Sequence, residues 1–219
     1  HGVSTKALIP VAGEPMVVHP VRALLAAPEV TSVQVMSQQP ERLAPVLPPD
    51  PEVVKQRSSG TIAETLLALC DDPGTSWPLL VTTADQVLLT PATITEFTAA
   101  ADGADVAVGC VERRTLLARL PDSRRTWLKF RGGAYSGANL FALTSPRARA
   151  AIAEWRAVEQ DRKKGWRVVR QFGLSLLLGA VLRLRTVHQT AAALGRRLGV
   201  DLHVVVLSDL VERVLAGRA

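Results

Sequence analysis

Short apolar segments alternate with amphipathic segments through the first half of the chain. Four of the apolar segments have the length and character of β-strands: 32–36, 52–55, 78–83 and 104–109. Three amphipathic segments space their apolar residues as helices do: 16–27, 61–70 and 91–101. This alternation indicates βαβ units, and therefore a largely parallel sheet with helices on both faces. The segment 78–83 is so apolar that we expect it to be buried.

The second half of the chain interrupts this alternation. Segments 126–130 and 138–143 look like strands, and only the Gly-rich sequence RGGAYSG separates them. Two strands this close cannot be joined by a crossover helix, so we expect an antiparallel pair or a strand that turns a corner. A helix after Pro146, a helix at 190–198 and a last strand at 203–207 follow.

The composition is that of an ordinary globular protein of 219 residues, with 47% hydrophobic and 21% charged residues. It excludes a disordered chain and a fibre, and the length suits one α/β domain, residues 1–219. Every apolar run is shorter than the roughly 20 residues that span a bilayer. Cys70 and Cys110 lie in apolar surroundings without a ligand spacing, which predicts buried, reduced thiols in a cytoplasmic protein.

Charge is divided unevenly between the two halves of the chain. Residues 1–112 hold 5 Lys and Arg against 13 Asp and Glu, a net charge of −8. Residues 113–219 hold 21 against 7, a net charge of +14. A basic half suits an anionic partner such as a phosphorylated ligand, a nucleic acid or an acidic membrane surface. An Arg-rich solvated surface would explain the same counts.

The opening sequence KALIPVAGEPMVVHPVRALL holds the strongest candidate chemistry. Lys6 precedes an apolar run, Gly13 permits a sharp bend, and Pro15 suits the first turn of a helix. A lysine just ahead of a helix N-terminus can meet phosphate oxygens as a point charge. A solvated loop lysine is the alternative.

The pattern Lys–x–Leu–x–Pro–Val–x–Gly–x–Pro–Met at 6–16 resembles the start of the MobA-like NTP transferase family (molybdopterin-guanylyltransferase-like) and of sugar-phosphate nucleotidyltransferases. The resemblance implies an α/β, Rossmann-like, mixed and mostly parallel sheet of the nucleotide-diphospho-sugar transferase (GT-A-like) type. It implies Mg²⁺-dependent transfer of a nucleoside monophosphate from an NTP to a phosphorylated small-molecule acceptor, with release of pyrophosphate. In that family a first strand and a Gly-rich phosphate loop precede the motif, so we expect them to lie before residue 1.

A second match lies where the apolar segment 78–83 ends, in the sequence TADQV. Ligands collect beyond the carboxyl ends of parallel strands, and a carboxylate there can hold Mg²⁺. The resemblance implies that Asp85 binds the metal and that Lys6 and Asp85 are the catalytic residues. The family's usual proline shortly after this aspartate is absent, and capping of the next turn by Asp85 is the alternative.

The loop at 56–61, QRSSGT, lies between a predicted strand and a predicted helix. Its backbone N–H groups at the helix N-terminus suit a phosphate or a base edge, and ordinary capping by Ser or Thr is compatible with that role. In the resembling family this loop lines the nucleobase pocket. The resemblance therefore implies a nucleotide-binding set: Lys6, Ser59, Gly60, Thr61, Ala84 and Asp85.

The Gly-rich segment RGGAYSGANLF resembles the part of the family that frames the second substrate. Gly137 would let the backbone approach a ligand, and Asn139 would offer an amide donor and acceptor. Lys129 and Arg131 would face the phosphate of the acceptor. A Gly-rich strand corner or β-bulge is the alternative for the glycines.

The last predicted strand runs straight into a predicted helix whose natural N-cap is Ser208. Connections of about two to six residues are usual, so we expect residues to be missing between Leu207 and Ser208. The resemblance implies a second acidic metal ligand at this place. Asp201 and Asp209 are the nearest carboxylates, and Asp209 already lies within the predicted helix.

A helical, basic insert is predicted at about 146–185. Its part 161–185 combines basic residues around Trp166 with an apolar run, and a helical pair that buries its own Leu face is the favoured interpretation. Peripheral contact with an anionic membrane is the alternative, and the absence of a recognition motif argues against nucleic acid. A non-catalytic module that binds nucleotide or anionic membrane through the basic half is the alternative to the enzyme.

Overall fold

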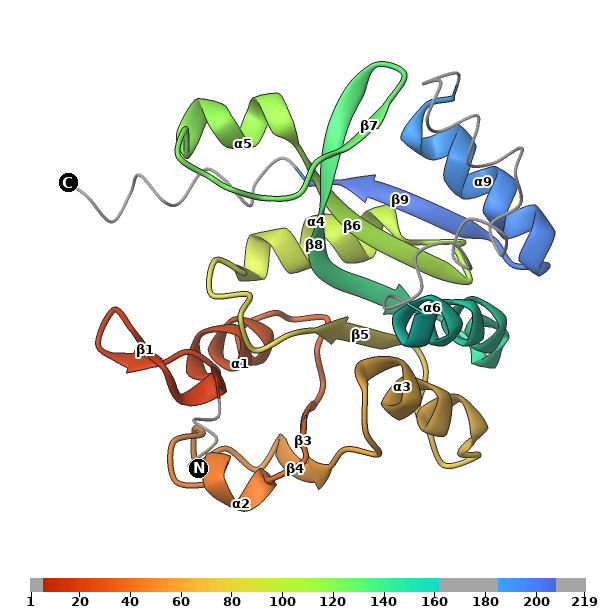
Figure 1. Cartoon of the computed structure of the whole chain (residues 1–219). Helices are drawn as coiled ribbons and strands as arrows, with labels where there is room; N and C mark the ends of the chain where they lie inside the picture. The colour runs from red at the N-terminus through yellow and green to blue at the C-terminus, as the bar shows by residue number, and fades with distance from the viewer. Residues whose placement is uncertain (1–5, 162–184, 208–219) are drawn as a thin grey trace.

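The computed structural model describes residues 6–161 and 185–207 (Figure 1). It contains a two-stranded parallel sheet and a five-stranded sheet, and helices cover both faces of the larger sheet. The predicted alternation of strands and helices is confirmed, with small shifts at the boundaries. None of the described helices is both long enough and apolar enough to cross a membrane.

A hairpin that the apolar pattern did not reveal begins the described chain. The 3₁₀ turn η1 (Lys6–Leu8) leads into β1 (Pro10–Val11), which pairs antiparallel with β2 (Glu14–Pro15). The two turn residues between these strands have φ of 49° and 86°, the left-handed values that a tight two-residue hairpin turn needs. Helix α1 (Val18–Leu25) follows and buries its apolar side.

The smaller sheet consists of β3 (Val33–Ser37) and β4 (Val53–Arg57), which pair in parallel. The short helix α2 (Pro40–Leu43) lies in the connection between them. Helix α3 (Ile62–Asp71) follows β4, and Thr61 caps its N-terminus. This part therefore forms the βαβ arrangement that the sequence predicts.

The larger sheet has the order β5–β8–β6–β9, with β7 also paired to β8. Its strands are β5 (Leu79–Thr82), β6 (Val106–Glu112), β7 (Leu128–Phe130), β8 (Gly133–Leu143) and β9 (Leu202–Val206). Strand β8 runs antiparallel to β5, β6 and β7, and β9 runs parallel to β6. Four of these five strands therefore share one direction, and the antiparallel pair expected around RGGAYSG is confirmed as the β7–β8 hairpin.

Two clusters of buried side chains lie on opposite faces of the larger sheet. One contains residues of α1 and of α4 (Pro91–Ala100), including Ile94 and Phe97 with no solvent exposure. The other lies under α3, the 3₁₀ turn η2 (Pro146–Ala148) and α6 (Arg149–Asp161).

Two further helices complete the described elements. Helix α5 (Arg113–Arg119) follows β6, and α9 (Val187–Leu198) packs against β9 and α6. The helices thus cover both faces of the sheet, as the sequence predicted (Figure 1).

Two predicted burials are wrong. Each residue of β5 is only half-buried, because β5 is an edge strand of the larger sheet among the described residues. Cys70 is half-buried because it lies in the last turn of α3, whereas Cys110 is buried as expected. Most of the predicted insert 161–185 and the junction between Leu207 and Ser208 lie outside the described residues.

Candidate active site

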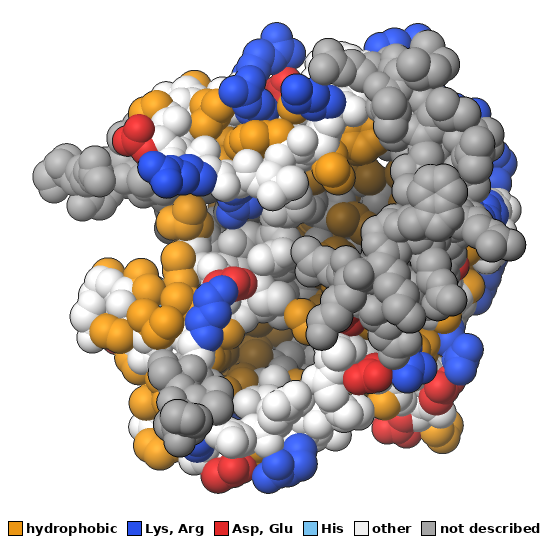
Figure 2. All heavy atoms as spheres, viewed as in Figure 1, with side chains coloured by type: hydrophobic (Ala, Val, Ile, Leu, Met, Phe, Trp, Pro, Cys, Tyr) orange, Lys and Arg blue, Asp and Glu red, His pale blue; other side chains and the backbone are white. Residues whose placement is uncertain are grey.

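Lys6 and Asp85 meet at the carboxyl edge of the sheet. The Nζ atom of Lys6 lies 2.7 Å from Oδ2 of Asp85, although 79 positions separate the two residues in the sequence. The side chains are 69% and 36% exposed, so both are open to a ligand. The molecule is hollowed on the face shown in Figure 2, between the part that holds β1 to β4 and the part that holds α5 and β7. This contact brings the two residues together, as the sequence predicts.

Asp85 has two further neighbours. The Thr83 hydroxyl donates to Oδ1 at 2.5 Å, and the Asn139 side-chain amide donates to the same oxygen at 3.5 Å. Two hydrogen bonds hold the pKa of the Asp85 carboxyl below its usual value. The bond from Lys6 has the largest effect, and the bond from Thr83 has the next largest. Asp85 is therefore ionised at neutral pH and able to bind a cation.

A β-bulge in β8 directs Asn139 towards Asp85. Val108 of β6 pairs with Phe141, but Cys110 pairs with Gly137, so three residues of β8 stand opposite one residue of β6. Asn139 lies in the bulge with φ of 49°, a left-handed value that Asn tolerates better than most residues.

Side chains near the end of β5 hold this bulge. The Thr82 hydroxyl donates to the carbonyl of Asn139 at 3.0 Å, and the buried Gln86 amide donates to the carbonyl of Ala138. The segment that carries Asp85, from the end of β5 to Gln86, therefore also fixes the backbone that presents Asn139. The bulge directly follows Gly137, and the acceptor-binding role of Gly137 and Asn139 stays a prediction.

The glycine of β6 opposite the bulge is explained by close packing. A Cβ atom at Gly109 would lie 3.2 Å from the carbonyl oxygen of Leu140 and 3.3 Å from Cδ1 of Leu207. These contacts are tighter than most Cβ atoms make, so the absent side chain makes room for the bulged strand.

The loop before α3 divides its polar groups between capping and the surface. The backbone N–H of Thr61 donates to Oε2 of Glu64 at 3.0 Å, and the Thr61 hydroxyl accepts from the Glu64 N–H at 3.3 Å. A side chain at Gly60 would collide with this Glu64 carboxylate. Ser59 is exposed, so Ser59 and Gly60 remain accessible while the polar groups of Thr61 form the capping box.

The remaining predicted acceptor residues lie on the β7–β8 hairpin. Lys129 is opposite Ala134, and Arg131 stands in the turn, where its N–H donates to the carbonyl of Arg185 at 2.9 Å. Both side chains are exposed. The hairpin turn and Asn139 are separated along β8 by on the order of 20 Å. Among the described contacts, nothing joins Lys129 or Arg131 to the Lys6–Asp85 pair.

Four side chains around the site were not singled out from the sequence: Thr82, Thr83, Gln86 and Arg125. The first three belong to the polar sequence TTADQ that ends an apolar strand, and this pattern was the available signal. Arg125 donates to the carbonyl of Gly137 at 3.0 Å, a contact that only the tertiary structure reveals. Ala84, a predicted nucleotide-binding residue, lines the adjoining slot.

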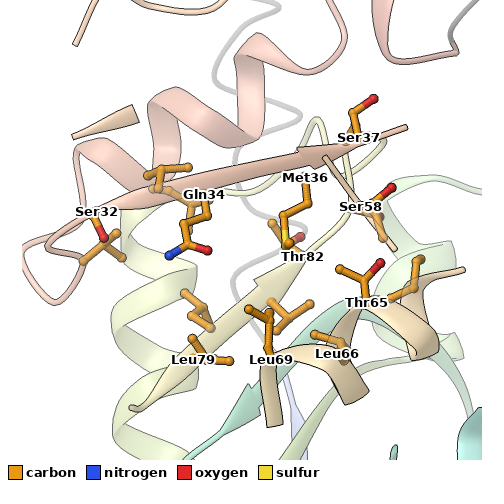
Figure 3. Close-up of a pocket in the computed structure, with 18 of the residues that line it drawn as sticks. Ser32, Gln34, Met36, Ser37, Ser58, Thr65, Leu66, Leu69, Leu79 and Thr82 are labelled. Atoms are coloured by element: carbon orange, nitrogen blue, oxygen red, sulfur yellow. The ribbon is translucent and has the colours of Figure 1, made fainter. Parts of the chain in front are cut away.

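A slot of about 580 Å³ opens beside this edge (Figure 3). It lies between β3 and β5, with α3 along one side. Ser37, Ser58, Gly60 and Ala84 line its end nearest Asp85. The predicted nucleotide-binding loop and the carboxyl end of β5 therefore share one cavity.

The sequence profile described as the MobA-like NTP transferase domain matches residues 2–176. The chain belongs to this family. The predicted family is thus confirmed, and the match supports a nucleotidyltransferase. Among curated proteins, no sequence matches the chain.

Solved structures agree on the fold of this MobA-like NTP transferase. A hypothetical transferase from Thermus thermophilus has 28% identity and a TM-score of 0.81, covering 96% of this chain and 87% of its own. 4-Diphosphocytidyl-2C-methyl-D-erythritol synthase from Anaerococcus prevotii has 11% identity and a TM-score of 0.55, with 93% and 81% covered. CMP:2-keto-3-deoxy-manno-octonic acid synthetase complexed with CTP has 12% identity and a TM-score of 0.56, with 92% and 83% covered. The mixed α/β fold of the nucleotide-diphospho-sugar transferase type is confirmed.

The residues around Asp85 fit a magnesium ion. Mg²⁺ prefers oxygen ligands and is commonly held by one or two carboxylates together with water and substrate phosphates. Asp85 offers an ionised carboxylate, and the Asn139 amide lies beside it. In residues 6–161 and 185–207, no group of three or more His, Cys, Asp or Glu could hold a metal. Among the described residues, Asp85 is the carboxylate that contacts both Lys6 and Asn139.

Asp201, considered above as a second acidic ligand, lies at the opposite edge of the sheet. Its N–H donates to Oδ2 of Asp105 at 2.8 Å, ahead of β6 and β9. Leu207, by contrast, reaches the carboxyl edge, where its N–H donates to the carbonyl of Cys110 at 2.8 Å. Asp209 lies outside the described residues.

Proposed function

We propose that this MobA-like NTP transferase moves a nucleoside monophosphate from an NTP to a phosphorylated small-molecule acceptor and uses Mg²⁺ in the cytoplasm. The observation that carries the proposal is the Lys6–Asp85 pair at the carboxyl edge of the sheet. Ligands of open α/β sheets bind at this edge. Family membership supports the nucleotidyl transfer, and the exposed cation and carboxylate suit a triphosphate with its metal.

The proposed reaction requires no covalent intermediate on the protein. An oxygen of the acceptor phosphate forms a bond to the α-phosphorus of the NTP. The bond between this phosphorus and the oxygen that bridges to the β-phosphate breaks, and pyrophosphate leaves with the electron pair. The protein therefore has to position both substrates and stabilise negative charge.

Lys6 would supply positive charge to the phosphates. Its ammonium group is largely exposed and flexible, so it can exchange its contact with Asp85 for phosphate oxygens. A cation at this place stabilises the charge that develops on the leaving pyrophosphate. The N–H of Val17, at the start of α1, donates to the carbonyl of Ala7 at 3.0 Å and so ties the turn that carries Lys6 to this helix.

Asp85 would hold Mg²⁺, with the Asn139 amide beside it, and the bound ion would neutralise phosphate charge. Thr83 and Asn139 fix the orientation of the Asp85 carboxylate through their hydrogen bonds. Ser59, Gly60 and Ala84 would contact the nucleotide, and Thr61 would shape that loop through its cap.

The acceptor would lie on the side of the β7–β8 hairpin. Asn139 and Gly137 stand at its inner end, where a Cβ atom at Gly137 would meet open space. Lys129 and Arg131 would contact the more distant phosphate of an extended acceptor. Arg125 is held beside Gly137 and adds positive charge nearer to the bulge.

The proposal is tested by pyrophosphate release from ATP, GTP, CTP and UTP with a panel of sugar phosphates, with and without Mg²⁺. We expect release for one NTP and one acceptor class, dependent on Mg²⁺. Thermal stabilisation by that NTP should show the same dependence. Nucleotide binding without turnover for any acceptor would favour a non-catalytic binding module.

A further inference from the structure

Two ion pairs join helix α6 to helix α3, which lie side by side (Figure 1). Arg149 donates to both carboxylate oxygens of Asp71, at 2.6 and 3.3 Å, at the C-terminal end of α3. The Nη2 atom of Arg156 lies 3.2 Å from Oε1 of Glu64, in the first turn of α3. The two pairs are spaced by about two helical turns on each helix, so the helices run antiparallel. The Arg156 pair therefore lies at the end of α3 that follows the loop at 58–61.

The Glu64 carboxylate connects Arg156 to this loop. Its Oε2 atom accepts the Thr61 N–H at 3.0 Å, and a Cβ atom at Gly60 would collide with the same oxygen. Its Oε1 atom accepts from Arg156. The Thr61 N–H lowers the pKa of the Glu64 carboxyl most, and Arg156 lowers this pKa further, so Glu64 is ionised at neutral pH. One charged group thus links α6 to the backbone of the loop.

The loop is fixed at its two ends and open between them. The Ser58 N–H donates to the last carbonyl of β3 at 2.9 Å, and Glu64 holds the Thr61 N–H. Among the described contacts, the N–H groups of Ser59 and Gly60 have no protein partner. These two residues are the ones that the proposed function assigns to the nucleotide. Their placement depends on the end of the loop that Glu64 holds.

Helix α6 gives Arg156 a fixed support. Ile152 is buried and belongs to the same cluster as Ala63 of α3. Trp155 packs against Phe141 of β8, with the ring centroids 5.2 Å apart. The core therefore fixes the point from which the half-exposed Arg156 side chain extends to α3.

We propose that Arg156 is a positioning residue for the nucleotide, because it fixes the loop at 58–61 through the Glu64 carboxylate and balances the charge of that carboxylate. The proposal rests on the proposed function for its ligand, whereas the link between α6 and the loop belongs to the chain alone. Without Arg156, a loop that is less ordered would bind the nucleotide more weakly, and an unpaired carboxylate would repel an anionic ligand. The effect should fall on NTP affinity, since the loop holds the nucleotide equally before and during the reaction.

The first measurement is amide hydrogen exchange of Thr61 in the chain without nucleotide. We expect Arg156→Ala to speed this exchange about fivefold, because the carboxylate that accepts the Thr61 N–H loses its partially exposed ion pair. Arg156→Lys keeps a cation and should restore slower exchange. Unchanged exchange in Arg156→Ala would overturn the proposal.

Arg149→Ala is the matched control for a merely structural role. It removes the other ion pair between the same helices, and both arginines are exposed enough for either variant to fold. We expect Arg149→Ala to leave the exchange of Thr61 unchanged. Equal acceleration in Arg149→Ala and Arg156→Ala would show that both residues act only on the packing of the two helices, and this result would contradict the proposal.

The second measurement is steady-state kinetics with the preferred NTP. We expect Arg156→Ala to raise KM for the NTP about fivefold and to change kcat less than about twofold. Arg149→Ala should change neither constant, and Arg156→Lys should recover most of the affinity. An unchanged KM, or a loss confined to kcat, would overturn the positioning role.

A double-mutant cycle tests whether Arg156 acts through Glu64. Glu64→Gln keeps an acceptor for the Thr61 N–H but removes the charge. In this background we expect Arg156→Ala to change KM less than about twofold further. A further rise as large as that in the unaltered chain would contradict the proposed link. If the unaltered chain binds no NTP, the proposed function fails, and the exchange of Thr61 alone decides whether Arg156 holds the loop.

Discussion

The ammonium of Lys6 lies 2.7 Å from the carboxylate of Asp85, which joins the start of the described chain to the carboxyl end of β5. Both side chains are exposed, so the pair contributes little to stability. In the proposed function, the pair places a cation and a carboxylate where a triphosphate and its metal would bind.

Replacement of Asp85 by Asn removes the charge but keeps the size of the side chain. We expect Asp85→Asn to reduce turnover at least about a hundredfold, on the scale of losing an electrostatic stabiliser. Thermal unfolding should change little, since the carboxylate is partly exposed. The measurement is the initial rate of pyrophosphate release.

Asp102→Asn provides a matched control for this variant. Asp102 lies at the opposite edge of the sheet, where its carboxylate accepts a hydrogen bond from the Gly103 N–H at 3.0 Å. An Asn side chain retains that acceptor, so activity should stay near normal. Similar losses in Asp102→Asn and Asp85→Asn would show that the effect is not specific to the site.

Two replacements of Asn139 distinguish the role of its backbone conformation in the bulge from the role of its side-chain amide. Asn139 has φ of 49°, which Gly adopts freely and Ala does not. We expect Asn139→Gly to keep the stability of the fold but to weaken Mg²⁺-dependent NTP binding, because the amide beside Asp85 is lost. Asn139→Ala should lose the same binding and also lower the unfolding temperature. Equal NTP binding by Asn139→Gly and the unaltered chain would remove Asn139 from the site.

The two thiols should differ in reactivity. Burial raises the pKa of the Cys110 thiol from its ordinary 9.0 to about 11, and burial also raises the pKa of the half-exposed Cys70. We expect iodoacetamide at pH 8 to alkylate Cys70 faster than Cys110 in the native protein, and both alike in denaturant. Mass spectrometry of the labelled peptides reads out each site.

The same shift at Cys110 predicts a pH dependence of stability. The folded pKa lies above the unfolded value, so this contribution is complete below about pH 9 and is lost as pH rises through about 11. Replacement of Cys110 by Ser, read by unfolding at pH 8 and pH 11, should abolish this part of the pH dependence. An unchanged profile would contradict the assignment.

Replacement of Phe97 tests the packing of the core on which the site rests. Its side chain has no solvent exposure and packs in the cluster that includes Leu140 of the bulge. We expect Phe97→Ala to lower the free energy of unfolding by about 3–5 kcal/mol in urea titrations. Thr95→Ala on the exposed side of the same helix should change it by less than about 0.5 kcal/mol. A small effect of Phe97→Ala would contradict the described packing.

The sequence predicted those parts of the fold that depend on local pattern. Apolar periodicity located the main strands and helices, and the short connection around RGGAYSG predicted the β7–β8 hairpin. The hairpin at Ala12 and Gly13 was not found, because Ala is rare at a left-handed turn position and gives no signal. The half-exposure of β5 also escaped prediction, because it depends on which strand pairs with it.

The candidate site was predictable only in part. Lys6 and Asp85 follow from motifs, and the structure places them in contact. The link between Asp85 and Asn139 depends on a register shift between β6 and β8, and such a shift arises from tertiary pairing. Arg125 likewise reaches Gly137 through a long loop whose course is not encoded in a local pattern.

The most direct test of a metal–nucleotide site at Asp85 replaces Mg²⁺ with paramagnetic Mn²⁺ in the presence of the preferred NTP. Nuclear magnetic resonance then maps which backbone amides lose intensity. We expect the losses to centre on residues 82–86 and Asn139, and to disappear in Asp85→Asn but not in Asp102→Asn. Losses centred away from the carboxyl end of β5, or unchanged in Asp85→Asn, would contradict the account.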